Sequence, residues 1–207
     1  MKVVRIPAGI YAANCYLVYS ENDNKEGIVI DPGGDVDDIT AQIENLGLSI
    51  KYIILTHGHG DHIAGINELK KYVDVPVAIH KDDEYLLKNG DENLSSMMPM
   101  GTVELSADIL LDDGDEIAFG DITAKIIHTP GHTPGGISIK IGNNLFTGDT
   151  LFAGSIGRTD FPGSSFEKIM SSIKDKLLIY PDDTIVYPGH GPSSTIKREK
   201  ASNPFLK

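Results

Sequence analysis

Three of the seven histidines of this chain lie within six residues of one another, in the segment Thr56-His57-Gly58-His59-Gly60-Asp61-His62. Side chains of this kind are costly to bury without partners, so packing in a hydrophobic core does not explain the cluster. Imidazole nitrogens and carboxylate oxygens are, in contrast, ligands of zinc and related cations. Gly58 and Gly60 would allow tight backbone turns that bring neighbouring side chains to one point. The segment therefore predicts a metal site.

Three further potential ligands lie later in the chain: His132 in TPGHTPG, Asp149 in FTGDT and His190 in YPGHG. Each stands beside a glycine, directly after a predicted strand, as the first cluster does. A single aspartate or histidine in a turn is common and needs no special role. Four strand ends that all deliver such a residue are much harder to explain without a shared cation.

Short apolar runs separated by turns predict the elements that would position these residues. Strands are expected at 14–19, 27–30, 51–55, 75–79 and 184–187, and several more between Ile109 and Phe146. The segment 90–105, with Met97, Met98, Pro99 and Met100, has no clear periodicity and is expected to be a surface loop or a flap over a site. Two strand-rich blocks with helical segments predict two sheets packed face to face, with helices outside.

Three helices are expected between and after these strands. The first is capped by Asp35 and ended by Gly47, with Ile39, Ile43 and Leu46 on its apolar face. The second contains Ile63, Ile66 and Leu69. The third follows a capping box of Ser164 and Glu167, with Phe166, Ile169, Met170, Ile173 and Leu177 on one face.

Composition restricts the class of protein. The 207 residues, 40% hydrophobic and 23% charged, suit a single globular domain over 1–207. The formal charge of −12 disfavours binding to nucleic acid. Cys15 is the one cysteine, the N-terminus lacks an apolar leader, and no apolar run approaches the ~18 residues of a membrane helix. We expect a cytoplasmic protein without a disulfide or a membrane span.

The segment THGHGDH resembles the T-H-x-H-x-D-H motif of the metallo-β-lactamase superfamily, and His132, Asp149 and His190 match its remaining ligands in chain order. The resemblance extends over essentially the whole chain, from 14–18 to 203–206. It implies an α/β (α+β) fold, a four-layer αββα sandwich of two mixed β-sheets with helices on the outer faces. It also implies that His57, His59 and His132 hold a first metal, that Asp61, His62 and His190 hold a second, and that Asp149 bridges both.

Two divalent metal ions would be the cofactors. The nitrogen and carboxylate ligand set suits zinc, and it would also accept iron or manganese. Two such ions can lower the pKa of a shared water to near 7, which predicts hydrolysis of a carbonyl or phosphoryl compound. Asp61, as ligand and hydrogen-bond acceptor, would also orient the nucleophile. A thiolate leaving group needs little help from a general acid, which favours thioesters over amides.

The segment GSIGRTDFPG, residues 154–163, resembles a loop of short bacterial glyoxalase II-like hydrolases. The resemblance implies hydroxyacylglutathione hydrolase activity, the cleavage of a small thioester such as S-lactoylglutathione. The chain ends at Lys207 without the helical domain by which longer members help to bind glutathione, which leaves the thiol carrier open. Arg158 would hold a substrate carboxylate, or else form a structural salt bridge with Asp160.

Other functions remain open at this point. Persulfide dioxygenases share the implied fold and a similar Gly-Arg-Thr-Asp-Phe stretch, and their single iron would lie on His57, His132 and Asp149. Another hydrolase of the same fold would keep the ligands and change the substrate. The complete ligand set argues against a non-catalytic protein, and the missing leader argues against a β-lactamase. We expect a monomer or small homo-oligomer that acts on a small molecule.

Four other residues have chemistry that the predicted site does not need. His80 and His128 are expected to be structural or to support the ligands, because the ligand set is already complete. Cys15 lies among apolar residues and is expected in the core. Asp31 precedes a Gly-Gly turn, and it either forms that turn or contacts the metal-binding loop.

Overall fold

The first half of the chain forms a mixed sheet of six strands in the order β1-β2-β3-β4-β5-β6. A computed structural model describes residues 1–99 and 101–207. The strands are β1 (Lys2–Ala8), β2 (Ala13–Tyr19), β3 (Glu26–Ile30), β4 (Ser49–Ile54), β5 (Val77–His80) and β6 (Ile109–Leu111). β1, β2 and β3 pair antiparallel, whereas β3 to β6 pair parallel. The parallel strands end at one edge, where the histidine cluster follows β4.

The second half forms another six-stranded sheet, in the order β14-β13-β10-β9-β8-β7. Its strands are β7 (Glu116–Phe119), β8 (Ile122–His128), β9 (Ile137–Ile141), β10 (Asn144–Gly148), β13 (Ile185–Pro188) and β14 (Ser194–Thr195). A separate hairpin pairs β11 (Leu151–Phe152) with β12 (Ser155–Ile156). Because β10 and β13 are parallel, Asp149 and His190 leave the sheet at the same edge.

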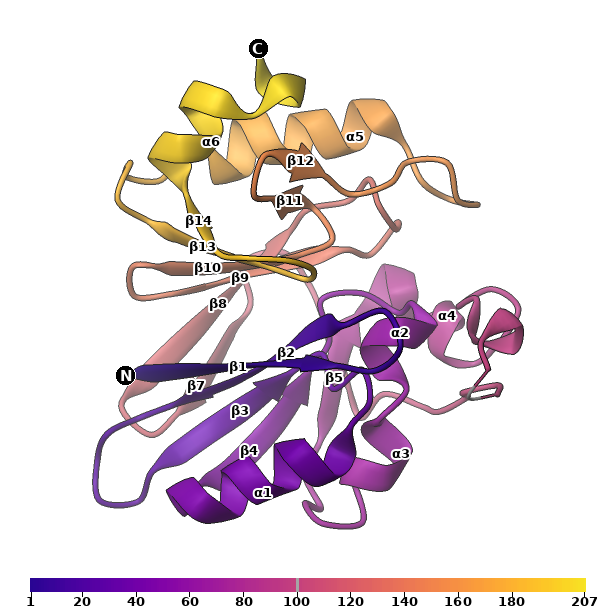
Figure 1. Cartoon of the computed structure of the whole chain (residues 1–207), viewed down its shortest axis with the longest axis vertical. Coiled ribbons are helices and arrows are strands. Elements are labelled where there is room, and N and C mark those ends of the chain that lie inside the picture. The colour runs from indigo at the N-terminus through magenta and orange to yellow at the C-terminus, as the bar shows by residue number, and fades with distance from the viewer. Residues whose placement is uncertain (100) are drawn as a thin grey trace.

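Helices cover the outer face of each sheet (Figure 1), so the predicted four-layer sandwich of two mixed sheets is confirmed. Along the first sheet lie α1 (Val36–Leu46), α2 (Gly60–Ile63), α3 (Ile66–Leu69), η1 (Lys81–Asp83), α4 (Glu84–Leu87) and η2 (Ser95–Met97). Along the second lie α5 (Phe166–Ser171), its π-helical continuation η3 (Ser172–Leu177), α6 (Ile196–Ser202) and η4 (Pro204–Leu206). No helix in the described part of the chain is long and apolar enough to cross a membrane.

Alternation along the strands fills three apolar layers. On β2, Tyr16 and Val18 pack between the sheets, whereas Cys15 and Leu17 face the helices of the first half. On β10, Phe146 joins the central layer, whereas Leu145 packs against the helices of the second half. Cys15 is fully buried, and burial raises the pKa of its thiol far above the usual range, so it is a core residue as predicted.

The helix starts differ from the sequence prediction. Asp35 occupies the position before α1 but does not cap it; its backbone is left-handed, and its carboxylate accepts a hydrogen bond from the Gly9 amide at 2.9 Å. The α5 cap is Ser165, whose hydroxyl accepts from the Lys168 amide, and not Ser164, whose hydroxyl donates to a carbonyl of the preceding loop. A tertiary donor therefore engages the first predicted cap, whereas the second bonds locally to the loop before its helix.

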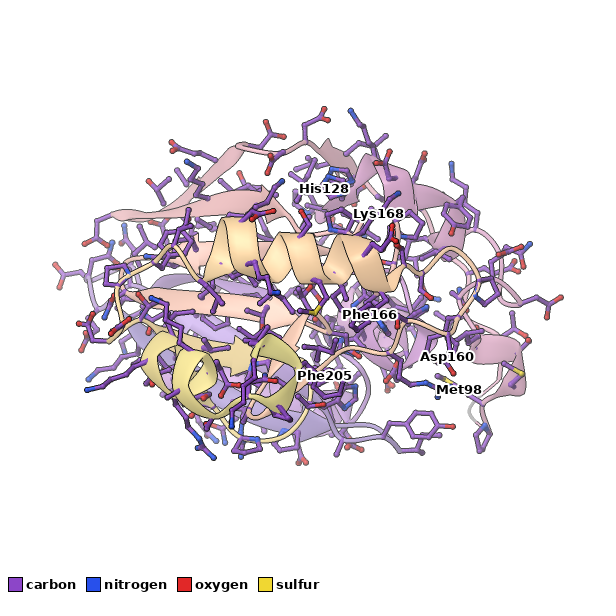
Figure 2. The ribbon with its side chains drawn as sticks, turned by 90° about the horizontal axis from the view of Figure 1, so that it is seen from above. Met98, His128, Asp160, Phe166, Lys168 and Phe205 are labelled. Carbon is purple, nitrogen blue, oxygen red and sulfur yellow. The ribbon has the colours of Figure 1, made fainter. Side chains whose placement is uncertain are left out.

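Two further helical predictions need correction. Phe166, predicted on the apolar face, is 53% exposed at the start of α5 (Figure 2). Ile63, Ile66 and Leu69 are buried as expected, but they belong to two single turns, α2 and α3, rather than to one helix. The sequence did not predict α6, because a single large apolar side chain, Ile196, among its seven residues gives no helical periodicity.

Candidate metal centre

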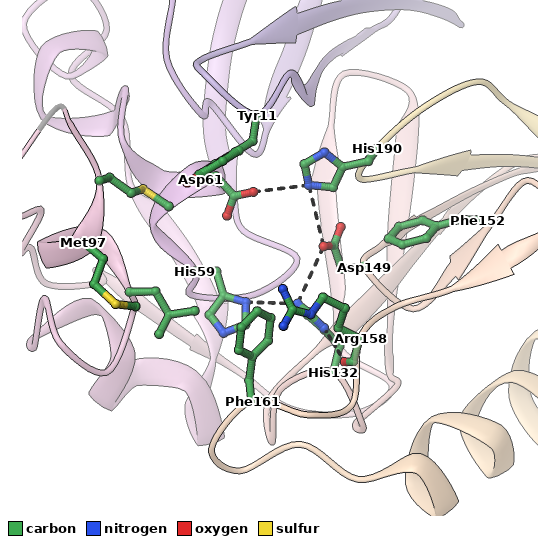
Figure 3. A pocket seen from close by; sticks show the side chains of 12 residues that line it. Tyr11, His59, Asp61, Met97, His132, Asp149, Phe152, Arg158, Phe161 and His190 are labelled. Atoms are coloured by element: carbon green, nitrogen blue, oxygen red, sulfur yellow. Dashed lines mark hydrogen bonds and ion pairs between the residues drawn. The ribbon is translucent and has the colours of Figure 1, made fainter.

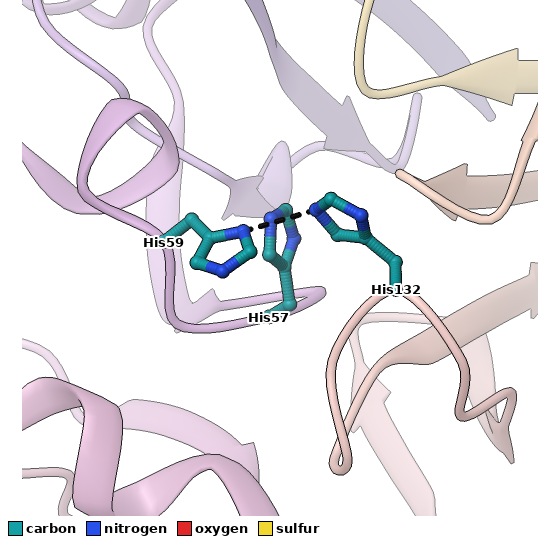
Figure 4. A group of neighbouring side chains, drawn as sticks. All are labelled: His57, His59 and His132. Carbon is teal, nitrogen blue, oxygen red and sulfur yellow. Dashed lines mark hydrogen bonds between the residues drawn. The ribbon is translucent and has the colours of Figure 1, made fainter. Parts of the chain in front are cut away.

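The seven predicted ligands converge where the strand ends of the two sheets meet; Figure 3 shows His59, Asp61, His132, Asp149 and His190 among them. Six of the seven form two groups whose potential ligand atoms lie within 4.8 Å of one another: His57, His59 and His132, and Asp61, His62 and His190. In the first group, His59 Nδ1 and His132 Nε2 are 3.0 Å apart (Figure 4). In the second, His62 Nε2 and His190 Nε2 are 3.2 Å apart. The structure thus brings together every residue that the sequence predicted as a ligand.

Asp149 lies between the two groups. One carboxylate oxygen is 3.4 Å from His62 Nε2, and the other is 3.6 Å from His132 Nε2 and 3.7 Å from His190 Nε2. A single carboxylate therefore reaches both groups, which is the placement that a bridging ligand requires.

The donor atoms fit a divalent cation in each group. His57 Nε2 and Asp149 Oδ1 are buried without a hydrogen-bond partner among the described residues, which is costly unless a cation satisfies them. In each group two imidazole nitrogens lie at hydrogen-bond distance from each other, those of His59 and His132 in the first and those of His62 and His190 in the second. Five imidazoles and two carboxylates form a set that suits zinc, manganese or iron.

Burial and charge set the protonation of the two groups in opposite directions. Burial, reinforced by the neighbouring imidazoles, lowers the pKa of His57 far below its usual range and that of His59 to about 3. Burial also opposes protonation of His62 and His190, but the carboxylates outweigh it: Asp61 raises the pKa of both rings. His57 and His59 therefore favour the neutral form, whereas His62 and His190 are coupled to carboxylates.

Hydrogen bonds fix the ring orientations from behind. Asp31 accepts from the Thr56 amide at 2.7 Å, from the Thr56 hydroxyl at 2.5 Å and from His62 Nδ1 at 3.0 Å, which leaves His62 Nε2 toward the centre. His132 Nδ1 lies 2.8 Å from the carbonyl oxygen of Arg158, which leaves His132 Nε2 toward the centre in the same way. Asp31 thus contacts the metal-binding loop, one of the two roles considered from the sequence.

Asp83 supports the centre and was missed in the sequence. It is fully buried and accepts from the Gly58 amide at 3.2 Å, the Thr133 hydroxyl at 2.7 Å and the Gly135 amide at 2.5 Å. Burial raises its pKa to about 6. The carboxylate ties the loop of His57 and His59 to the loop of His132. Nothing in the sequence distinguishes Asp83 from the exposed Asp82 beside it.

The glycines of the cluster serve close packing rather than tight turns. Neither Gly58 nor Gly60 has a positive φ, contrary to the role expected from the sequence. A Cβ at Gly58 would lie 2.6 Å from Leu86 Cβ, and one at Gly60 would lie 2.9 Å from Ser95 Cβ. Their absence of a side chain lets α4 and the segment after it press against the histidine loop.

Arg158 lines the cavity beside the centre, but its guanidinium already has partners. It donates two hydrogen bonds to Asp160, at 2.9 and 2.8 Å, and lies 4.2 Å from the ring centre of Phe161. This arrangement matches the salt bridge considered as the alternative. Binding of a substrate carboxylate by Arg158 stays a prediction.

His80 and His128 lie outside the two groups and stack on each other, with ring centres 4.0 Å apart and planes at 11°. His128 Nε2 is 2.9 Å from the carbonyl oxygen of Pro134, two residues beyond His132. His80 Nδ1 accepts from the Asp82 amide at 3.2 Å. Both rings therefore brace the loops next to the centre, consistent with the structural role expected for them.

The segment 90–105 is anchored rather than free at the surface. Asn93 is fully buried, and its side-chain amide donates to the backbone carbonyls of Leu86 and Val103. Its backbone carbonyl accepts a hydrogen bond from the Gly60 amide at 2.7 Å. Met97 and Met98, with Leu94, line the cavity beside the metal ligands. Met100 lies outside the described residues. The segment thus forms a wall of the cavity.

Comparison with known proteins points to one family. The chain matches the model of the Metallo-beta-lactamase superfamily over residues 8–190. It is 38% identical to a protein of Haemophilus influenzae named hydroxyacylglutathione hydrolase GloC, over 100% of this chain and 98% of that protein.

Solved structures show the same similarity. The BLEG-1 B3 metallo-beta-lactamase has a TM-score of 0.93 at 37% identity, with both chains covered completely. TTHA1623 in a di-iron-bound form has a TM-score of 0.86 at 33% identity, over 98% of this chain and 100% of that one. ETHE1 from Myxococcus xanthus has a TM-score of 0.80 at 28% identity, over 99% of this chain and 84% of that one.

Proposed function

The chain belongs to the metallo-beta-lactamase superfamily and is a metallo-hydrolase of that fold, and from this premise we propose that it cleaves small thioesters at a centre of two divalent ions. The observation that carries the proposal is the second group, Asp61, His62 and His190, which faces the centre together with Asp149. A one-metal enzyme has no need of this group. The similarity to GloC supports a thioester such as S-lactoylglutathione as the substrate.

Thioester hydrolysis adds water across the acyl carbon–sulfur bond. A C–O bond forms and the C–S bond breaks, so that the products are a carboxylate, a thiol and one proton. Two cations held by the ligand groups would supply hydroxide at neutral pH and a positive charge for the carbonyl oxygen. Zinc suits this ligand set, and iron or manganese also fits it.

The protein groups orient the reactants. Asp61 lines the cavity, and one of its carboxylate oxygens lies 3.2 Å from His190 Nε2. In that position it would accept a hydrogen bond from the attacking water and turn an oxygen lone pair toward the acyl carbon. The leaving group is a thiolate, whose conjugate thiol has a pKa of about 8.5, so it leaves without a dedicated general acid.

The rival function is oxidation of a persulfide by a single iron on His57, His132 and Asp149. The similarity to ETHE1 fits this alternative. The geometry favours the hydrolase, because the rival leaves Asp61, His62 and His190 as a second ligand group without a task.

The deciding experiment is a paired assay on zinc-loaded and iron-loaded protein. We expect thiol release from S-lactoylglutathione and no oxygen uptake with glutathione persulfide. Oxygen uptake in the iron form alone, with no thioester cleavage in either form, would overturn the proposal. A β-lactam included as a third substrate tests the remaining hydrolase alternative, to which the similarity to BLEG-1 belongs.

We propose further that the protein acts in the cytoplasm as a single domain over 1–207, as a monomer or small homo-oligomer, on a small molecule. The formal charge of −12 supports the exclusion of nucleic acid from its partners. Size-exclusion chromatography with light scattering tests the assembly, and a shift in elution with added DNA or RNA would contradict the partner assignment.

A further inference from the structure

The cavity beside the metal ligands has a volume of about 470 Å³ and a partly apolar wall. Besides the ligands, six large apolar or aromatic side chains line it: Tyr11, Leu94, Met97, Met98, Phe152 and Phe161. In Figure 3, Met97 and Phe161 stand on the side of His59, and Phe152 stands on the side of His190. An apolar wall around few polar groups is typical of a pocket that takes an apolar group.

Phe161 packs against the first ligand group. Its ring centre lies 5.4 Å from that of His59 and 5.9 Å from that of His132, in edge-to-face arrangements. A group attached to a carbonyl carbon that reacts at these ligands would therefore lie within reach of the Phe161 ring. Met97, by contrast, is 73% exposed and forms the rim.

The charges around the cavity argue against an anionic arm at this wall. Apart from the metal ligands, Arg158 is the one cationic side chain among the described residues that line it, and its Nε–Nη2 edge donates to Asp160. A substrate carboxylate that used this edge would have to displace Asp160, two residues away in the same chain. An apolar arm faces no such competition and gains by leaving water.

We propose that the acyl half of the thioester is apolar and larger than lactoyl, an aryl or branched alkyl group, and that Phe161 determines this preference. The inference rests on the proposed thioester hydrolysis and names the substrate class of the same site. Phe161 acts here as a specificity-determining residue, because its ring contacts the acyl arm and not the bond that breaks.

Two substrates that differ only in the acyl arm provide the test: S-lactoylglutathione, with a methyl group, and S-mandeloylglutathione, with a phenyl group at the same carbon. We expect the protein to favour the mandeloyl thioester by about tenfold or more in kcat/KM, a typical discrimination for added apolar surface in a pocket. The Phe161→Ala variant should bring the ratio of the two kcat/KM values close to one.

Phe166→Ala is the matched control, because it removes the same side chain from an exposed position at the start of α5, outside the cavity lining (Figure 2). It should keep the wild-type ratio. Metal content measured on both variants separates a change of selectivity from loss of the centre. If Phe161→Ala fails to fold, Phe161→Leu and the rim variant Met97→Ala should each lower the ratio.

A second pair of substrates assigns the preference to the acyl half. Lactoyl and mandeloyl thioesters of N-acetylcysteamine carry the same acyl groups on a small neutral thiol, and they should show the same preference. Equal kcat/KM values for the two acyl groups, a preference that Phe161→Ala retains, or one seen only with glutathione would each overturn the inference alone. Cleavage of none of the four thioesters would overturn the proposed function and the inference with it.

Discussion

The two ligand groups of the metal centre differ in charge, exposure and support. His57, His59 and His132 provide nitrogen alone and are almost completely buried, with exposures of 2%, 6% and 5%. The second group includes a carboxylate, and its outer members are more open: the side chains of His190 and Asp61 are 28% and 19% exposed. We therefore expect the first group to shield its cation from solvent and the more open second group to exchange its cation more readily.

Each group also has its own buried carboxylate behind it. Asp83 joins the two loops of the first group, one from each sheet. Asp31 follows β3 and orients His62 of the second group, which lies in α2. Asp83 therefore links loops from the two sheets behind the first group, whereas Asp31 fixes one ring of the second. The following variants test this contrast between the two ligand groups.

Asp149→Ala should have the largest effect, because Asp149 is the residue that both groups share. We expect loss of metal from both groups and a fall in kcat of at least ~10²-fold, the scale of losing one positioned charge in an active site. Elemental analysis and steady-state kinetics on the same preparation provide the measurement. Asp160→Ala, an exposed carboxylate nearby, is the control, and unchanged metal content in Asp149→Ala would contradict the bridging role.

His190→Ala should separate the two groups. It removes the most exposed ligand of the second group and leaves the first intact, so we expect about one ion lost per chain and a rate reduced by ~10²-fold or more. His57→Ala should instead leave an unoccupied buried space in the first group and remove the shielded ion. A dilute chelator, followed by elemental analysis over time, should strip the wild-type protein of the second ion first. Full activity in His190→Ala would favour the one-metal rival.

The ligands were predictable because ligation depends on residue type, and residue type is written in the sequence. His57, His132, Asp149 and His190 each follow a strand beside glycine, so their convergence followed from strand ends meeting at one edge. The two sheets were also predictable, because apolar runs and turns are local patterns.

The supports behind the ligands were not predictable in the same way. Asp83 and Asp82 are adjacent and chemically identical, and only the packing of α4 against the Gly58 loop buries one of them. Likewise, Asp35 satisfies the helix-capping pattern, but a tertiary donor, the Gly9 amide, engages its carboxylate. Which partner a polar side chain finds depends on contacts between distant segments, which the local pattern does not contain.

Asp83→Asn should have an intermediate effect that depends on pH. Because the folded-state pKa of Asp83 is raised from 3.8 to about 6, the folded protein binds this proton more tightly than the unfolded chain does. The free energy of unfolding should therefore fall as pH rises from about 4 to about 6, by up to about 3 kcal/mol, and stay level above that range. Asp83→Asn should lack this component of the slope, as measured by urea denaturation of chelated protein.

The same variant should weaken metal binding, because an amide presents one acceptor oxygen to three donors that a carboxylate satisfies. We expect a loss of affinity for the first ion of about 10–100-fold, the usual cost of removing a support behind a ligand. Asp82→Asn is the matched control, since its side chain is 48% exposed and accepts none of these three hydrogen bonds. An identical pH slope in wild type and Asp83→Asn would exclude the buried carboxyl as its source.

Arg158→Ala should have the smallest effect of the series. A guanidinium that anchors a substrate carboxylate would raise KM strongly when removed, with kcat and metal content unchanged. The structure instead pairs Arg158 with Asp160 and stacks it on Phe161, with both charged side chains about two-thirds exposed. Because the guanidinium is directed at Asp160 in the same loop, we expect KM to rise no more than about threefold. Arg158→Met keeps a long apolar side chain beside Phe161 without the guanidinium, so it should restore KM if packing is the role of Arg158. A tenfold rise in KM in both variants, abolished with the N-acetylcysteamine thioester, would instead show that Arg158 leaves Asp160 to bind the carboxylate of glutathione.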